Sequence, residues 1–157
     1  MGWNTTVAVL EHTTIADLGR AGLTPAGDPV TADEATSLLY DGVAAQQQGA
    51  HVVLLGGGPD LMVEAPGWAA ALGRTLVLAV WGSTGSTWVW SVAGPDVQRQ
   101  VVVADYAVAD TTGEPQPEES QVTTRLEDDP EDWLFELLEA RTGVRLDLEA
   151  PAQPLAW

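Results

Sequence analysis

A chain of 157 residues, 45% of them hydrophobic, is long enough to form one domain that buries about 70% of its unfolded surface. It contains no cysteine, which excludes disulfide bonds, thiolate metal sites and a cysteine nucleophile. Its 23 acidic residues against six arginines give a net charge of −17, which argues against nucleic-acid and membrane-surface binding and favours a basic protein partner.

The first half of the chain predicts a mixture of strands and helices. Residues 3–10 alternate as a strand does, and Thr31 and Glu34 have the spacing of a capping box before a helix over about 32–45. Residues 51–55 and 61–64 predict two short strands, joined as a hairpin across the glycine-proline break at 56–59.

The second half predicts three strands, at 75–81, 87–93 and 98–106, joined by turns short enough for antiparallel hairpins. The acidic, proline-containing segment 110–124 is typical of a mobile loop. Asp129 is a suitable cap for a following helix that begins at Pro130 and ends at Gly143.

These elements predict a single α+β domain over residues 1–147, followed by an extended tail at 148–157. We expect a mostly antiparallel sheet of about five or six strands, with helices packed chiefly on one face. The amino terminus lacks the pattern of a signal peptide, and no apolar run approaches the length of a membrane span. We therefore expect a cytoplasmic protein without a membrane partner.

The most informative feature is the distribution of acidic residues. Fourteen of the 23 lie between Asp105 and Glu149, and five of these crowd into residues 127–132. Two carboxylates would suffice for helix capping, so the others are either a solvated acidic turn or a docking surface for a basic partner. A calcium site fits less well, because the alternating spacing of an EF-hand loop is missing. The candidate partner-binding residues are Glu114, Glu118, Glu119, Glu127, Asp128, Asp132 and Trp157.

No catalytic, metal-binding or cofactor-binding motif is present. The glycine run at 56–58 lacks the following Lys-Ser/Thr of a phosphate-binding loop, and neither His12 nor His51 lies in a nucleophile motif. The leading hypothesis is thus a non-enzymatic protein-binding module, for example an immunity or inhibitor protein, that uses its acidic carboxyl-terminal surface. The alternatives are a nucleic-acid mimic that inhibits a DNA-binding protein, and a small-molecule binder or enzyme with a pocket near His51 and Trp68.

Four segments resemble an uncharacterised family of small proteins, a domain of unknown function that is frequent in actinobacteria. Residues 61–68 (LMVEAPGW) are similar to its L-x-V-E-P-N-G-W motif, and residues 142–146 (TGVRL) match its T-G-V-R-L motif. The strand pair VLAVWGS and WVWSVAG and the opening Trp3 strand also fit that family. The resemblance implies a compact α+β domain in a bacterial cytoplasm, and it carries over no catalytic or binding residues.

Overall fold

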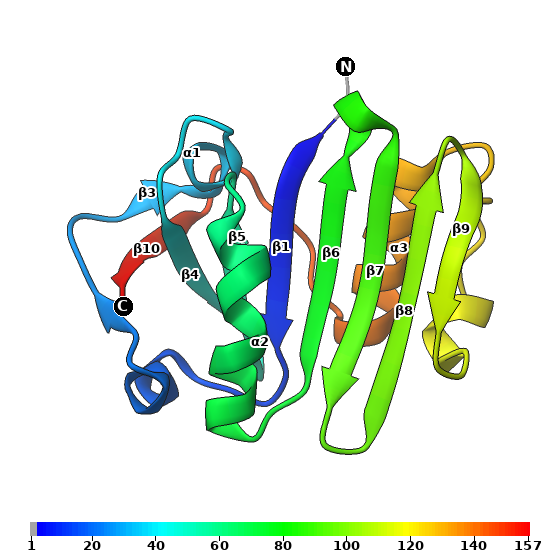
Figure 1. The fold of residues 1–157 in the computed structure, drawn as a ribbon. Coiled ribbons are helices and arrows are strands. Elements are labelled where there is room, and N and C mark those ends of the chain that lie inside the picture. Colours follow the sequence, from blue (N-terminus) through cyan, green and yellow to red (C-terminus); the bar gives the residue numbers. More distant parts are fainter. Residues whose placement is uncertain (1–2) are drawn as a thin grey trace.

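The computed structural model describes residues 3–157, which form one β-sheet with helices on both of its faces (Figure 1). Short 3-10 helices are labelled η. The elements in chain order are β1 (Asn4–Leu10), η1 (Ile15–Ala21), β2 (Thr24–Pro25), β3 (Val30–Thr31), α1 (Ala32–Thr36), β4 (Val43–Gln48), β5 (His51–Gly56), α2 (Asp60–Leu72), β6 (Leu76–Gly82), η2 (Ser83–Gly85), β7 (Thr87–Gly94), β8 (Val97–Ala104), β9 (Ala107–Thr112), η3 (Pro117–Ser120), α3 (Pro130–Thr142) and β10 (Pro151–Ala156).

The described part of the chain contributes ten strands to the sheet, so the prediction of about five or six strands was wrong. The strand order is β2-β10-β4-β5-β1-β6-β7-β8-β9, and β3 pairs with β10. All pairings within residues 3–157 are antiparallel, in agreement with the predicted type of sheet. Strands β4, β9 and β10 overlap segments that the sequence assigned to a helix, a loop and a tail, whereas β2 and β3 lie in a stretch for which no strand was predicted.

The helices cover opposite faces of the sheet, so the prediction of helices chiefly on one face was also wrong. Helix α2 and η1 lie on one face of the sheet, and α1 and α3 lie on the other (Figure 1). The central strands are therefore buried on both sides, and residues 7–10 of β1 are fully inaccessible to solvent. No helix in residues 3–157 has both the length and the apolar character needed to cross a bilayer.

Residues 61–64 belong to helix α2, and the predicted hairpin with residues 51–55 does not form. The glycine run instead connects β5 to α2. A Cβ atom at Gly57 would collide with the backbone carbonyl of Ser37, so this connection requires a glycine. The predicted helix over about 32–45 is likewise shorter than expected, because α1 ends at Thr36 and Val43 begins strand β4.

The acidic segment and the tail both take part in regular structure. Segment 110–124, predicted as a mobile loop, contains the end of β9 and the single turn of η3. Residues 151–156 of the tail form β10, which lies between β2 and β4 in the sheet. The tail is extended, and it pairs within the sheet as an internal strand.

Candidate functional site

Helix α3 begins in the middle of the acidic run. The Asp129 side chain caps the helix by accepting a hydrogen bond from the backbone N–H of Asp132 at 3.0 Å. Pro130 occupies the first turn, where a missing N–H costs no helical hydrogen bond. The sequence therefore predicted this helix start correctly, and the cap accounts for one of the five clustered carboxylates.

Glu131 attaches the start of α3 to the sheet. Its Oε2 atom accepts hydrogen bonds from the Ser83 hydroxyl at 2.7 Å and from the backbone N–H of Trp3 at 3.2 Å. The Trp81 indole N–H donates to the backbone carbonyl of Glu131 at 3.2 Å. These three contacts fix the position of the acidic helix start relative to β1, β6 and η2.

An aromatic pair borders the same helix start. The Trp88 ring on β7 lies 5.3 Å, centroid to centroid, from the ring of Tyr106 in the turn between β8 and β9. Trp88 is 2% exposed, and its indole N–H has no hydrogen-bond partner within residues 3–157, whereas Tyr106 is 49% exposed. Tyr106 also has a φ of 65°, a left-handed conformation that is uncommon outside glycine.

The acidic residues and the aromatic pair together enclose a surface hollow of about 350 Å³. We call it the acidic hollow. Its lining residues are Ser83, Trp88, Tyr106, Asp128, Asp129, Pro130 and Glu131. The hollow thus combines carboxylates with aromatic rings and one buried, unpaired donor, within a single concave site.

The carboxylates at this helix start repel one another. The Asp129 carboxylate, with smaller contributions from burial, Glu136 and Glu131, raises the pKa of Asp132 above its ordinary value. Arg125 offers only weak neutralisation, since it lies 3.8 Å from Glu127 and 4.0 Å from Asp128 and all three side chains are exposed. Among residues 3–157, the negative charge around the acidic hollow is therefore largely uncompensated.

Glu136, one turn further along α3, has the opposite environment. Its carboxylate accepts hydrogen bonds from the backbone N–H and the hydroxyl of both Thr123 and Thr124, at 2.9–3.1 Å. These hydrogen bonds, chiefly those from Thr124, lower the pKa of Glu136 below its ordinary value. The contact holds the segment before the acidic run against α3.

We expect the substitution Glu136→Gln to lower the melting temperature at neutral pH and to have little effect in acid. Because folding lowers the pKa of Glu136, its contribution to stability is present above the ordinary carboxyl pKa and is lost as the pH falls through the folded pKa. Thermal unfolding of the wild-type protein and the variant between pH 7 and pH 3 measures the difference between their melting temperatures. A difference that stays constant down to pH 3 would contradict a stabilising role for the ionised Glu136.

The seven residues proposed from the sequence do not form one site. Asp128 lines the acidic hollow, and Glu127 and Asp132 are exposed beside it. Glu114 is exposed after β9. Trp157 is half exposed on the opposite face of the sheet, where its ring packs at 5.3 Å from that of Trp68 on α2.

Glu118 and Glu119 point inward and join a network of ion pairs. Glu119 binds the Arg99 guanidinium through both of its oxygens, at 2.7 and 3.0 Å. Glu118 is 3% exposed and lies 3.6 Å from Arg141, which is also paired with Glu11. The contact with Glu11 raises the pKa of Arg141 above its ordinary value. These two carboxylates thus anchor η3, and the chain itself already neutralises them.

The two histidines lie next to each other, with ring centroids 5.3 Å apart, and the backbone N–H of His12 donates to His51 Nδ1 at 3.1 Å. Trp68 is a buried residue of α2, in a hydrophobic cluster that contains neither histidine. No group of three or more His, Asp or Glu side chains among residues 3–157 is arranged to hold a metal ion. The geometry therefore adds no support to the alternative of a pocket near His51 and Trp68.

Sequence reasoning missed Ser83, Trp88, Tyr106 and Glu131 as parts of the site. The available signal was the pair Asp105-Tyr106, which stands between two β-prone runs and forms the turn from β8 to β9. Comparisons with protein-family models, with curated proteins and with solved structures gave no match for this chain.

Proposed function

We propose that this protein is a non-enzymatic protein-binding module, of the immunity or inhibitor type, whose acidic hollow accepts a lysine or arginine side chain of a basic partner. The observation that carries the proposal is the conjunction, in one concave site, of uncompensated carboxylates with an exposed aromatic ring. We further propose a bacterial cytoplasmic setting and membership of the family that the sequence resembles.

The chemistry of the acidic hollow supports a cationic side chain as the ligand. Asp128 supplies a carboxylate, and the half-exposed Tyr106 ring supplies a face for a cation–π contact, which is worth about 0.5–1 kcal/mol at an exposed site. Trp88 lies beneath them with an unsatisfied indole N–H. A polypeptide brings a carbonyl acceptor together with its cation, so it suits this hollow better than a metal ion does.

The sign of the Asp132 pKa shift supports a functional role for the charge. Because folding raises the pKa of Asp132, its ionisation at neutral pH opposes folding. A bound cation relieves this repulsion. We therefore expect Asp132→Asn to leave the melting temperature unchanged or to raise it, although the same substitution weakens binding.

The test is binding of the peptides hexa-arginine and hexa-lysine, measured by titration calorimetry at low and high salt. We expect Asp128→Asn/Asp132→Asn to weaken binding at least about tenfold, and Tyr106→Ala to weaken it as well. The matched control is Asp28→Asn/Asp41→Asn, which removes the same charge from two exposed residues elsewhere. Equal losses in both double variants, or binding that does not weaken with salt, would refute the proposal.

A further inference from the structure

Helix α2 is apolar on its outer side as well as on the side that faces the core. Its buried residues pack against the sheet, yet its solvent-facing residues are also almost all apolar, and Val63 is 68% exposed. A helix that is apolar all round is normally covered on all sides. The exposed apolar residues of α2 are Met62, Val63, Pro66, Gly67, Ala70 and Ala71.

The sheet beside α2 is uncovered on the same face. Helix α2 lies over β5, β1 and β6, whereas β7, β8 and β9 have no helix in front of them (Figure 1). The side of β6 that faces α2 continues onto β7 and β8, because Val80 pairs with Val89 and Val89 pairs with Val102. The residues of the uncovered face on β7, β8 and β9 are Thr87, Val89, Ser91, Ala93, Gln98, Gln100, Val102, Ala104, Ala107, Asp110 and Thr112.

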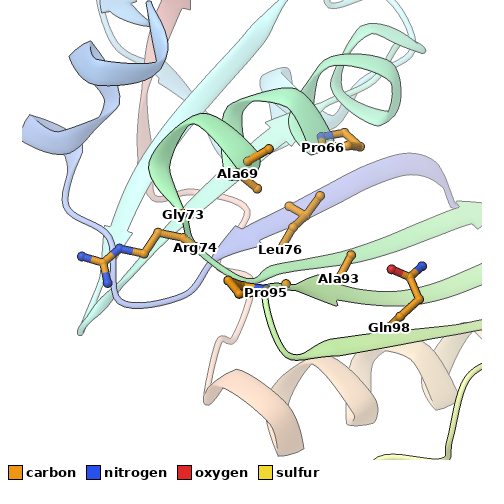
Figure 2. Close-up of a pocket in the computed structure, with 10 residues that line it drawn as sticks. Pro66, Ala69, Gly73, Arg74, Leu76, Ala93, Pro95 and Gln98 are labelled. Carbon is orange, nitrogen blue, oxygen red and sulfur yellow. The ribbon is translucent and has the colours of Figure 1, made fainter.

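A shallow apolar cavity joins the helix to the uncovered sheet. It measures about 330 Å³. Pro66 and Ala69 of α2 line it on one side, and Ala93 and Gln98 of the sheet line it on the other (Figure 2). Arg74 is among the residues that line it, and the end of its side chain extends away from Pro66 and Gln98 (Figure 2). The exposed side of α2, this cavity and the uncovered sheet therefore form one continuous surface. The half-exposed Trp157, whose ring packs against that of Trp68, extends this surface.

We infer that this surface binds a second copy of the chain, with α2 of each copy seated on the uncovered sheet of the other. A helix that stands above the sheet next to an uncovered half-sheet can be self-complementary under a two-fold axis, because each helix then covers the half-sheet of the other copy. We call this arrangement the helix-on-sheet dimer.

Charge favours a second copy over a basic partner here. Asp110 is the only charged residue in the uncovered-face set, Asp60 and Glu64 are the only ones on α2, and Arg74 is the only one that lines the cavity, in a chain of net charge −17. A basic protein finds little attraction at such a surface. Two copies of the same acidic chain, by contrast, approach each other with least repulsion where charge is sparse.

The test is the mass in solution, measured by light scattering after gel filtration and by sedimentation over a range of concentrations. We expect about 33 kDa, twice the chain mass of 16.5 kDa. Salt should strengthen the dimer, because it screens repulsion between the acidic copies. Binding of basic peptides at the acidic hollow responds to salt in the opposite direction, so the two proposals can fail separately.

Substitutions locate the interface. We expect Val63→Lys on α2 and Val89→Lys on the sheet each to weaken the dimer by about 100-fold, because two-fold symmetry introduces every lysine twice. The matched control is Val108→Lys on the edge strand β9, which is also exposed but faces the α3 side. Circular dichroism checks that each variant is folded.

Three outcomes would overturn the inference. The first is a monomer at every concentration. The second is a dimer that only Val108→Lys disrupts, which would indicate pairing through the edge of β9. The third is a dimer that Val63→Lys disrupts and Val89→Lys does not, which would indicate contact between the helices alone.

Discussion

We expect Trp81→Ala to lower the free energy of unfolding by about 3–5 kcal/mol, as large-to-small substitutions of buried aromatic residues do. Trp81 is fully buried on β6, and its ring centroid lies 4.6 Å from that of Phe135 on α3 and 5.7 Å from that of Trp3. Removing it opens a cavity between the sheet and α3, and it removes the indole N–H that binds the Glu131 carbonyl. Denaturant unfolding measures the loss.

Two further tryptophan variants separate packing from hydrogen bonding. Trp81→Phe keeps much of the ring volume and removes the N–H, so we expect a smaller loss. The hydrogen-bond part of that loss should be about 0.5–1.5 kcal/mol, because the Glu131 carbonyl lies within helix α3 and keeps its helical donor. Trp157→Ala deletes a half-exposed ring and should cost less than about 1 kcal/mol. A loss for Trp157→Ala as large as that for Trp81→Ala would contradict the assignment of Trp81 to the structural core.

The elements predicted correctly are those whose signals are local. Helix α3 has a capping aspartate, a first-turn proline and a terminal glycine within one short segment, and all three occupy the expected positions. Strands β6, β7 and β8 are joined by short turns, so their pairing follows from chain connectivity. In both cases the residues that decide the structure are neighbours in the sequence.

The elements that were missed depend on distant residues. Strand β10 comes from a tail that contains Pro151 and Pro154, and it forms only because β4 and β2 lie on either side of it. The first part of helix α2, residues 61–64, was misread as a strand because apolar residues surround the whole helix, which removes the 3.6-residue period that marks an amphipathic helix. Pro66 lies inside the helix, a position where proline is uncommon, and this obscured that residues 61–64 belong to the same helix as the residues after it.

The acidic hollow was visible in the sequence only in part. The surplus of carboxylates at 127–132 located the start of α3 as a site of unusual charge. The aromatic half of the hollow comes from Trp88 on β7 and from Tyr106 in the turn between β8 and β9, and no spacing in the sequence relates them to Asp128. Composition also could not distinguish the solvent-facing carboxylates from Glu118 and Glu119, because the distinction depends on where Arg141 and Arg99 lie in the fold.

The Arg99–Glu119 pair explains why an acidic, proline-containing segment is attached to this domain. Arg99 is buried on β8, and besides both Glu119 oxygens it binds the Gly113 carbonyl at 2.9 Å. Glu119 in turn accepts the backbone N–H of Gln116 at 2.6 Å. One arginine therefore holds both ends of the turn that follows β9, so removing it leaves a mostly buried carboxylate and a carbonyl without their partner.

We expect Arg99→Met to cost about 3 kcal/mol, as loss of one partner of a buried ion pair does. The double variant Arg99→Met/Glu119→Leu should recover part of that loss, because it no longer buries an unpaired charge, and the cycle should give a coupling energy above about 1 kcal/mol. Amide exchange at residues 113–121 should accelerate in the single variant, because the turn loses its anchor.

The matched control is the Arg145–Glu139 pair, which is equally close at 2.6 Å but whose side chains are 80% and 46% exposed. Its coupling energy should stay below about 1 kcal/mol, since solvent and salt screen an exposed pair. Equal coupling in the two cycles would mean that burial adds nothing to the Arg99 contact, and the segment after β9 would then have to be held by other interactions, such as the Glu136 contacts with Thr123 and Thr124.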